Sequence, residues 1–334
     1  MADFKNNFSW SKSRDETFKS CKRKYYYHYY GSWGGWEFNA ERKIRQLYIL
    51  KNLQSRYMWL GSIVHEFIEA ILTKELHEHE TNLYKLFGRM RQAMRQDFEN
   101  SEKGLYTKYP KIHGRTYGLL EHEYNIFVAN DEWKEISDNA EKCVANFYNS
   151  DTFNYIKSVE RKNWLPIESM RTFDFEGCDV YVVIDFAMRG GKNKNKNSKD
   201  KSQNLLSDYF TSEYDSYSDE NLIIFDWKTG KIRFEEMDVQ LACYSLYSKE
   251  KWNVSPENII CKKYNVMIDK VDDYEINDDV IEKVKGYIRE SITEMKELLY
   301  DKEENTARED DFELTEDENE CRMCNFKKVC PKWG

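Results

Sequence analysis

The sequence lacks the long apolar segments that mark membrane-spanning or secreted proteins. None of its hydrophobic runs approaches the ~18 residues that a transmembrane helix needs, so no membrane contact is expected. The N-terminal stretch Met-Ala-Asp-Phe-Lys-Asn-Asn has no apolar signal core, and we expect a cytoplasmic protein. The 8 cysteines are therefore expected to be reduced thiols or metal ligands rather than a disulfide framework.

Loops that bind nucleotides are missing as well. A phosphate-binding loop needs the pattern Gly-x4-Gly-Lys-Ser/Thr, and the pairs Gly191-Lys192 and Gly230-Lys231 stand without the rest of it. The sequence also has no nucleophile elbow and no dinucleotide-binding glycine pattern. Any ATP-driven unwinding of a nucleic acid would therefore need a helicase or another partner in trans.

The chain has enough apolar residues for a large folded core. Of its 334 residues 40% are hydrophobic, and 9 Trp, 24 Tyr and 18 Phe are among them, which excludes global disorder. The formal net charge of −9 by itself argues against a nucleic-acid partner. The charge is unevenly distributed, however. Residues 1–60 carry 12 Lys/Arg against 5 Asp/Glu, whereas residues 297–320 carry 2 against 12.

The basic N-terminal region is interleaved with aromatic residues, above all in the stretch Cys21-Lys-Arg-Lys-Tyr-Tyr-Tyr-His-Tyr-Tyr30. Basic residues for phosphates beside rings for base stacking would suit a surface for single-stranded nucleic acid. The same pattern is also typical of an amphipathic helix with a solvated basic face and a tyrosine-rich core face. Both interpretations stay open here. The candidate nucleic-acid-binding residues are Lys22, Arg23, Lys24 and Tyr25.

Hydrophobic periodicity predicts helices in the first half of the chain and strands in the second. The resulting order of elements indicates an α/β or α+β core. Residues 61–160 are expected to be mostly helical, beginning with a helix at 61–76, and further helices are expected at 11–30, 236–250 and 279–300. Strands are expected at 171–175, 180–188, 221–228 and 259–268, the first two joined at Glu176-Gly177. The Lys/Asn-rich stretch at about 190–220 is expected to be a mobile insertion, and the acidic run 297–320 a solvated linker.

The most informative segment is Asn221-Leu-Ile-Ile-Phe-Asp-Trp-Lys-Thr-Gly230, an apolar strand that ends in charged residues. Because side chains alternate along a strand, Asp226 and Lys228 lie on one face, about 6–7 Å apart. A second apolar strand, Val180-Tyr-Val-Val-Ile-Asp185, carries a single acid. If these strands are neighbours, two carboxylates and a lysine converge, a set that can bind Mg²⁺ and act on a phosphodiester. The alternative is an ion pair at a fraying strand end.

Further motifs accompany these strands. Gly61-Ser-Ile-Val-His-Glu66 precedes them and Gln240-Leu-Ala-Cys-Tyr244 follows them, and the i, i+4 spacing places Gln240 and Tyr244 on one helical face. With this set of motifs in this order, the chain resembles the PD-(D/E)XK nuclease superfamily and, within it, the RecB-type branch. It departs from that branch at Val182, where a glycine is usual, and the insertion lengthens the interval between the second and third motifs.

The resemblance implies a restriction-endonuclease-like core, with a mixed central sheet flanked by helices and a large helical N-terminal and inserted region. It also implies a metal site. The implied ligands of Mg²⁺ or Mn²⁺ are His65, Asp185, Asp226 and the backbone carbonyl of Trp227. Lys228 is implied to position or activate the attacking water, while Gln240 and Tyr244 hold Lys228 and the DNA strand.

The C-terminal stretch Cys321-Arg-Met-Cys324-Asn-Phe-Lys-Lys-Val-Cys330 supplies three soft metal ligands. The RecB-type nucleases that contain an iron–sulfur cluster have a further cysteine near the N-terminus, and Cys21 matches it. The resemblance therefore implies a [4Fe–4S] cluster that joins the two termini as a clasp. Zn²⁺ held by the same four thiolates is the alternative. The remaining cysteines are expected in the core: Cys143, Cys178, Cys243 and Cys261.

These expectations together describe a metal-dependent deoxyribonuclease that acts from ends, on single-stranded or frayed DNA. The resemblance implies a role in DNA repair, recombination or defence against phage. We expect a single nuclease domain, 1–334, made of a basic aromatic region 1–60, a helical region 61–160, a catalytic core 165–300, and an acidic linker with the cysteine triplet, 301–334. The alternatives are a non-catalytic nucleic-acid-binding or partner-docking module of the same fold, an RNA nuclease, and a nuclease subunit active only in a larger complex.

Overall fold

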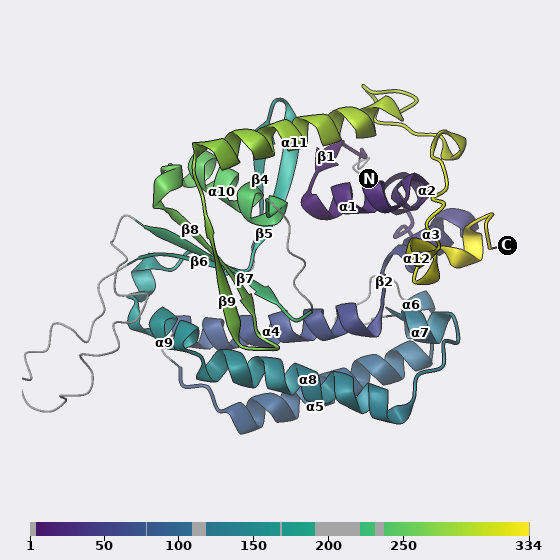
Figure 1. Ribbon diagram of the computed structural model, residues 1–334. Helices are drawn as coiled ribbons and strands as arrows, with labels where there is room; N and C mark the ends of the chain where they lie inside the picture. The colour runs from purple at the N-terminus through teal and green to yellow at the C-terminus, as the bar shows by residue number, and fades with distance from the viewer. Residues whose placement is uncertain are drawn as a thin grey trace, which may run out of the picture.

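Two β-sheets, joined through one bent stretch of chain, form the centre of the protein, and helices cover them on both sides (Figure 1). The computed structural model describes residues 5–77, 79–108, 118–167, 169–190, 221–230 and 237–333. The insertion expected at about 190–220 falls, from residue 191 on, outside the described residues. This mixed α/β arrangement confirms the predicted fold class.

The first sheet has the strand order β1-β5-β4 and the second the order β6-β7-β8-β9. Because β7 and β8 pair in parallel while their outer neighbours are antiparallel, the second sheet is mixed, as expected. The hairpin turn joining β4 and β5 is Glu176-Gly177, with φ values of 52° and 77°, which favour glycine. The strands are β1 (Ser9–Trp10), β2 (Leu53–Gln54), β3 (Gly118–Leu119), β4 (Ser169–Phe175), β5 (Cys178–Ile184), β6 (Phe186–Arg189), β7 (Leu222–Lys228), β8 (Ile259–Asn265) and β9 (Lys270–Glu275).

The expected helical region lies on one side of the second sheet, and two helices of the second half of the chain lie on the other (Figure 1). No helix in the described part of the chain combines the length and the apolar character that crossing a membrane requires. The helices are α1 (Lys12–Ser20), α2 (Lys22–Tyr26), α3 (Arg42–Lys51), α4 (Arg56–Leu76), α5 (Leu83–Glu102), α6 (Leu105–Lys108), α7 (Leu120–Glu123), α8 (Asn130–Asn149), α9 (Asp151–Ser158), α10 (Val239–Trp252), α11 (Asp278–Glu297) and α12 (Glu318–Arg322).

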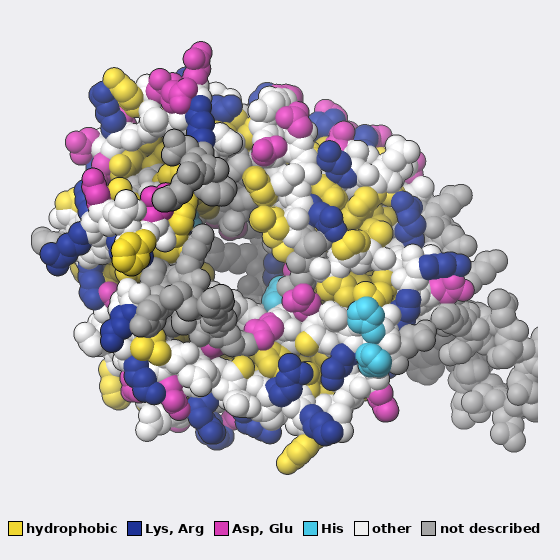
Figure 2. Space-filling model, turned by 180° about the vertical axis from the view of Figure 1, so that it is seen from behind, with side chains coloured by type: hydrophobic (Ala, Val, Ile, Leu, Met, Phe, Trp, Pro, Cys, Tyr) yellow, Lys and Arg dark blue, Asp and Glu magenta, His cyan; other side chains and the backbone are white. Residues whose placement is uncertain are grey.

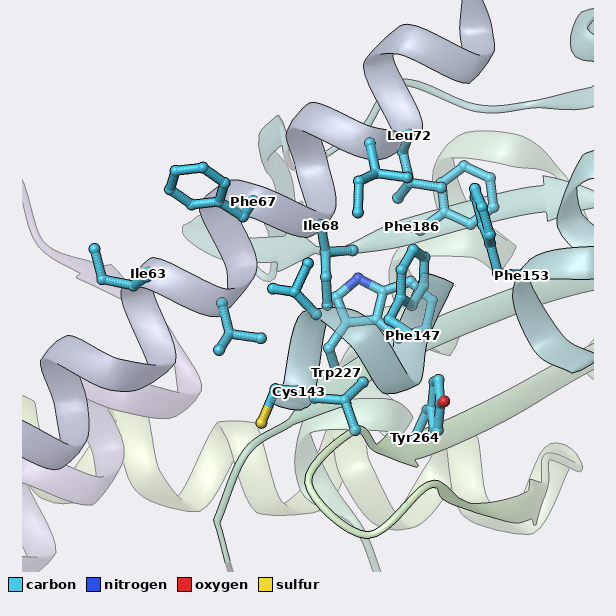
Figure 3. Close-up of a cluster of buried hydrophobic side chains, with 14 of the residues drawn as sticks. Ile63, Phe67, Ile68, Leu72, Cys143, Phe147, Phe153, Phe186, Trp227 and Tyr264 are labelled. Carbon is cyan, nitrogen blue, oxygen red and sulfur yellow. The ribbon is translucent and has the colours of Figure 1, made fainter. Parts of the chain in front are cut away.

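Trp227 anchors strand β7 in the core between the sheet and the helices α4 and α8. Its ring is fully buried and lies among Ile68 of α4, Phe147 of α8 and Phe153 of α9 (Figure 3). The ring centroids of Trp227 and Phe147 are 5.2 Å apart in an edge-to-face arrangement that favours the attraction between aromatic rings. Since alternate residues of a strand face opposite ways, burial of Trp227 on this side directs its two charged neighbours toward α10.

The single helix expected over 11–30 is wrong. The chain breaks at Cys21, whose backbone is extended (φ −166°), and continues as α2 and then as one π-helical turn, Tyr27–Gly31. The break has a local cause: Cys21 takes the position before the first turn of α2, where its Sγ accepts a hydrogen bond from the Lys24 backbone N–H.

The acidic run 297–320 is only in part the solvated linker that its composition predicts. Most of its acidic side chains are exposed, but Phe312 in its middle is 0% exposed. The Glu309 carboxylate accepts hydrogen bonds from the Tyr27 hydroxyl at 2.8 Å and from Lys43 Nζ at 2.8 Å, and pairs with Arg23 at 3.3 Å. The acidic run therefore packs against the basic N-terminal region, because opposite charges from the two ends of the chain lie side by side.

Candidate active site

Asp185 lies at the bend between β5 and β6. Ile184 faces the core that α10 and α11 share with the sheets, whereas Phe186 faces the core that contains α4. The alternation of side chains therefore breaks at Asp185, as it does at a β-bulge. As a result the buried carboxylate reaches β7, where its Oδ2 accepts a hydrogen bond from the Trp227 backbone N–H at 2.7 Å. This hydrogen bond brings the Asp185 carboxylate to the residue that follows Asp226 in β7.

Asp226 of β7 is 1% exposed, and neither of its carboxylate oxygens accepts a hydrogen bond of normal geometry. Among the described residues, Lys228 balances the buried negative charge of Asp226 through an ion pair, with its Nζ 2.8 Å from Asp226 Oδ2. Burial raises the pKa of Asp226 to about 6; Lys228 opposes this rise, and the nearby charge of Asp185 adds to it. A buried carboxylate that is so poorly compensated, beside a second one, favours a bound cation.

Lys228 is held from the other side by helix α10. Its Nζ donates a hydrogen bond to Gln240 Oε1 at 3.0 Å, and Gln240 Nε2 donates in turn to the Tyr244 hydroxyl oxygen at 2.5 Å. The i, i+4 spacing that the sequence indicates is therefore used to build a relay of contacts along one face of α10. Burial raises the pKa of Tyr244 well above its usual range, so its hydroxyl remains protonated.

His65 reaches the same place from α4. Its Nδ1 lies 3.4 Å from Asp185 Oδ1, and its Nε2 lies 3.2 Å from the carbonyl oxygen of Trp227. The structure thus brings together every residue that the sequence proposes for the metal site and its surroundings. These residues are His65, Asp185, Asp226, Trp227, Lys228, Gln240 and Tyr244.

The donor set fits a hard divalent cation better than a soft one. Within the described ranges, no group of three or more His, Cys, Asp and Glu side chains could hold a metal ion as it stands. Mg²⁺ does not need such a group, because it typically keeps several waters and binds one or two carboxylates. Asp185 and Asp226 supply these carboxylates, and the Trp227 carbonyl is a further oxygen donor. The residues present therefore fit Mg²⁺ or Mn²⁺.

Sequence reasoning missed an ion pair that supports this site. Lys263 of β8 is the register neighbour of Asp226, and its Nζ pairs with Asp238. The other carboxylate oxygen of Asp238 caps α10 by accepting a hydrogen bond from the Leu241 backbone N–H at 3.0 Å. One carboxylate thus fixes the start of α10, and with it Gln240, against the sheet. The signal was available in the sequence, since an Asp before a helix is a common cap.

We expect Asp238→Ser to lower the free energy of unfolding by about 3 kcal/mol, because it removes one partner of a largely buried ion pair. Serine keeps a side-chain cap for α10, so the loss reports on the pair rather than on the cap. The double variant Asp238→Ser/Lys263→Met is expected to be more stable than the sum of the two single changes indicates. Urea unfolding of the four proteins measures this coupling. Strict additivity would contradict it.

The four cysteines proposed for a clasp lie around one small cavity. Cys21, at the start of α2, lines it together with Cys321, Cys324 and Cys330. All four are free thiols, and Cys324 Sγ accepts a hydrogen bond from the Phe326 backbone N–H at 3.4 Å. Burial raises the pKa of Cys324, and the neighbouring Cys21 and Cys330 raise it as well. The residues that would bind a soft metal are therefore gathered from both ends of the chain.

The basic aromatic region is mostly occupied by internal contacts. Tyr25 is 0% exposed, and its ring packs against Phe18 at 5.1 Å and Phe312 at 6.1 Å between centroids. Its ring is not accessible to a base, so the expectation that Tyr25 binds nucleic acid is wrong. Arg23 donates to the Phe312 carbonyl at 2.8 Å and is mostly buried. The core-face interpretation of the tyrosines therefore holds for Tyr25, while Lys22 and Lys24 stay candidates.

A sequence model of a known family matches residues 9–186 and 210–331, which is most of the chain. The chain belongs to the PD-(D/E)XK nuclease superfamily. The matched segments include the strands that carry Asp185 and Asp226 and the helices that carry His65 and Gln240. The predicted superfamily is thus confirmed, while its RecB-type branch and the cluster stay predictions for this nuclease. No curated protein sequence matches the nuclease significantly.

Proposed function

We propose that this nuclease hydrolyses phosphodiester bonds of DNA and requires Mg²⁺ or Mn²⁺. The observation that carries the proposal is the buried, poorly compensated Asp226 beside Asp185, with Lys228 Nζ 2.8 Å from Asp226 Oδ2. Burying two carboxylates costs free energy of folding. In a non-catalytic module of this fold, two apolar residues at these positions would avoid that cost, so nothing would favour the acids. Membership of the superfamily supports the nuclease activity itself.

The residues of the site take the following roles. Asp185, Asp226, the Trp227 carbonyl and His65 would hold the cation, which when bound lowers the pKa of a water and offsets the charge of the phosphodiester. Lys228 orients the attacking water and stabilises the negative charge that develops on the phosphate oxygens. Gln240 holds the Lys228 ammonium in place through its Oε1, and Tyr244 holds Gln240.

The proposal is tested by cleavage of end-labelled single-stranded DNA, double-stranded DNA and RNA with Mg²⁺ or Mn²⁺, on protein prepared without air. We expect Lys228→Met to lower the cleavage rate of DNA by about 10²- to 10³-fold, because it removes one charge from the transition state. Lys85→Met, an exposed position on α5, serves as the matched control and should leave the rate unchanged.

Undiminished cleavage by a folded Lys228→Met protein would overturn the assignment of the site. Faster cleavage of RNA than of DNA would replace the proposed substrate but keep the site. Cleavage that requires an added partner would identify the chain as a subunit that is active only in a complex.

We also propose that the four thiolates of the cavity hold a [4Fe–4S] cluster. The support is that all four cysteines, which come from both ends of the chain, line one cavity. Zn²⁺ held by the same four cysteines is the alternative. Iron and zinc analysis of protein prepared without air distinguishes the two.

A further inference from the structure

The hairpin β4–β5 presents an uncharged, uncovered strip beside the candidate active site. The register pairs Met170 with Val183 and Thr172 with Tyr181. Met170 is 69% exposed and Val183 is 45% exposed, although both are apolar and both lie on strands of the first sheet. We call these four residues the hairpin strip. Burying such side chains stabilises a protein, so their exposure in the middle of a hairpin needs a reason.

The hairpin strip faces away from α10 and α11 and ends two residues before Asp185. The even-numbered residues of β5 pack into the core with α10 and α11, so Tyr181 and Val183 face the opposite way. From that opposite side α4 packs against β6, and His65 of α4 contacts Asp185. The strip therefore lies on the side from which α4 reaches the catalytic carboxylate, whereas Asp226 and Lys228 are directed toward α10.

Figure 2, which shows the molecule from behind, has a central hollow with hydrophobic side chains beside it and a histidine and acidic side chains below it. Val183 is two residues and Tyr181 four residues from Asp185 along the chain, so their Cα atoms lie within ~7 Å and ~14 Å of it. A group bound at Val183 is thus close to a phosphate held at Asp185.

The chemistry of the strip selects a base rather than a phosphate. None of its four residues is charged. At the end of the strip nearest the hairpin turn, Asp174 and Asp179 are register partners, and their carboxylates repel phosphate groups. An aromatic ring beside a methionine and a valine matches the flat apolar face of a nucleobase. Thr172 and the Tyr181 hydroxyl are its only polar side-chain groups, so the strip offers little to distinguish one base from another.

We propose that the hairpin strip is a nucleobase subsite, in which the base next to the cleaved phosphate lies against Tyr181, Met170 and Val183. This inference rests on the proposed function and narrows its substrate class. A base inside a duplex is covered on both faces by its neighbours, so it meets the strip after it has left the stack. The subsite therefore selects unpaired nucleotides, with little preference among the four bases.

The test uses single-stranded oligonucleotides in which one abasic nucleotide is moved along the chain. For the native protein, we expect kcat/KM to fall about tenfold when the abasic nucleotide flanks the cleaved bond, because one stacked base is lost. For the variant Met170→Ser/Tyr181→Ser, intact and abasic substrates should be cleaved at rates within about twofold of each other. Tyr181→Phe, which keeps the ring, and Phe127→Ser, at a position 89% exposed on another segment, should behave like the native protein.

A second measurement separates the subsite from the catalysis. An oligonucleotide carrying 2-aminopurine is mixed with the protein without divalent metal, and its fluorescence reports stacking without cleavage. We expect quenching by the native protein and by Tyr181→Phe, and none by Met170→Ser/Tyr181→Ser. Quenching without any cleavage would support the subsite and contradict the proposed function. An equal abasic effect in the native protein and the double variant, or no quenching by the native protein, would overturn the subsite.

Discussion

Asp226→Asn is expected to abolish metal-dependent cleavage and yet, in metal-free protein at pH 7.5, to raise the free energy of unfolding by about 3 kcal/mol. The carboxylate is 1% exposed, and burial raises its pKa to about 6. The unfolded chain ionises Asp226 near the ordinary value of about 3.9, so folding opposes the charged form. Asparagine keeps the shape of the side chain and removes that charge. Lys228, whose side chain is 32% exposed, stays hydrated and keeps its contact with Gln240.

The stabilisation depends on pH in a defined direction. Because the folded-state pKa of Asp226 lies above the unfolded-state value, the native protein loses stability as the pH rises from about 4 to about 6, and the loss is complete above that. The difference between native protein and D226N should therefore be absent near pH 4 and full at pH 7. Urea unfolding between these values, in the presence of a chelator, measures it. An equal difference at all pH values would contradict the explanation.

Added Mn²⁺ is expected to reverse the order of the two proteins. A cation that binds the folded state stabilises the native protein by RT ln(1 + [Mn²⁺]/Kd), about 4.1 kcal/mol at a thousandfold excess over Kd, which exceeds the advantage of D226N in the metal-free state, whereas D226N lacks the ligand. Asp138→Asn, on the exposed face of α8, is the matched control and should respond to Mn²⁺ as the native protein does. Equal stabilisation of D226N and native protein would show that Asp226 does not bind the metal.

Cys324→Ser is expected to remove the visible absorption and the iron of protein prepared without air. It should also lower the midpoint of thermal unfolding by at least about 5 °C, because a metal held between the two termini contributes to folding directly. The clasp would join α2 to α12, and Tyr27 and Phe326 pack beside it with ring centroids 5.4 Å apart. Absorption spectra, iron analysis and thermal unfolding of the two proteins provide the measurements.

Cys178→Ala is the control for this experiment, since Cys178 is a buried cysteine of β5 outside the cavity. It should keep the colour and the iron content. A colourless native protein with one zinc per chain would instead establish the zinc alternative. A native protein without iron or zinc, with the midpoint unchanged in Cys324→Ser, would exclude a metal clasp.

The candidate site could be predicted from the sequence because its signals are local. Alternation along a strand places Asp226 and Lys228 on one face, and the i, i+4 spacing does the same for Gln240 and Tyr244. The structure places these four side chains in mutual contact. The order of the motifs identified the superfamily for the same reason, because each motif is read within a single helix or strand.

Two features were not predictable because they depend on contacts between distant segments. The bend at Asp185 interrupts what reads as one strand over 180–188, and it exists because the chain leaves one sheet there and joins the other. The Lys263–Asp238 pair depends on the register of β7 and β8, and no periodicity within either segment encodes that register.

By itself, the sequence determined the type of the elements that carry the site, the superfamily, and the residues from which the site is built, because these follow from spacing over a few residues. Which charged residues of the two ends of the chain pair with each other depends on the tertiary structure alone. The excess of basic residues over 1–60 and of acidic residues over 297–320 suggested an exposed surface and a linker. In the folded chain Glu309 binds Tyr27, Arg23 and Lys43, so part of each charge is compensated by the other. Net charge and local charge are both properties of the chain, but which charges remain free depends on which segments folding brings within a few ångströms of each other.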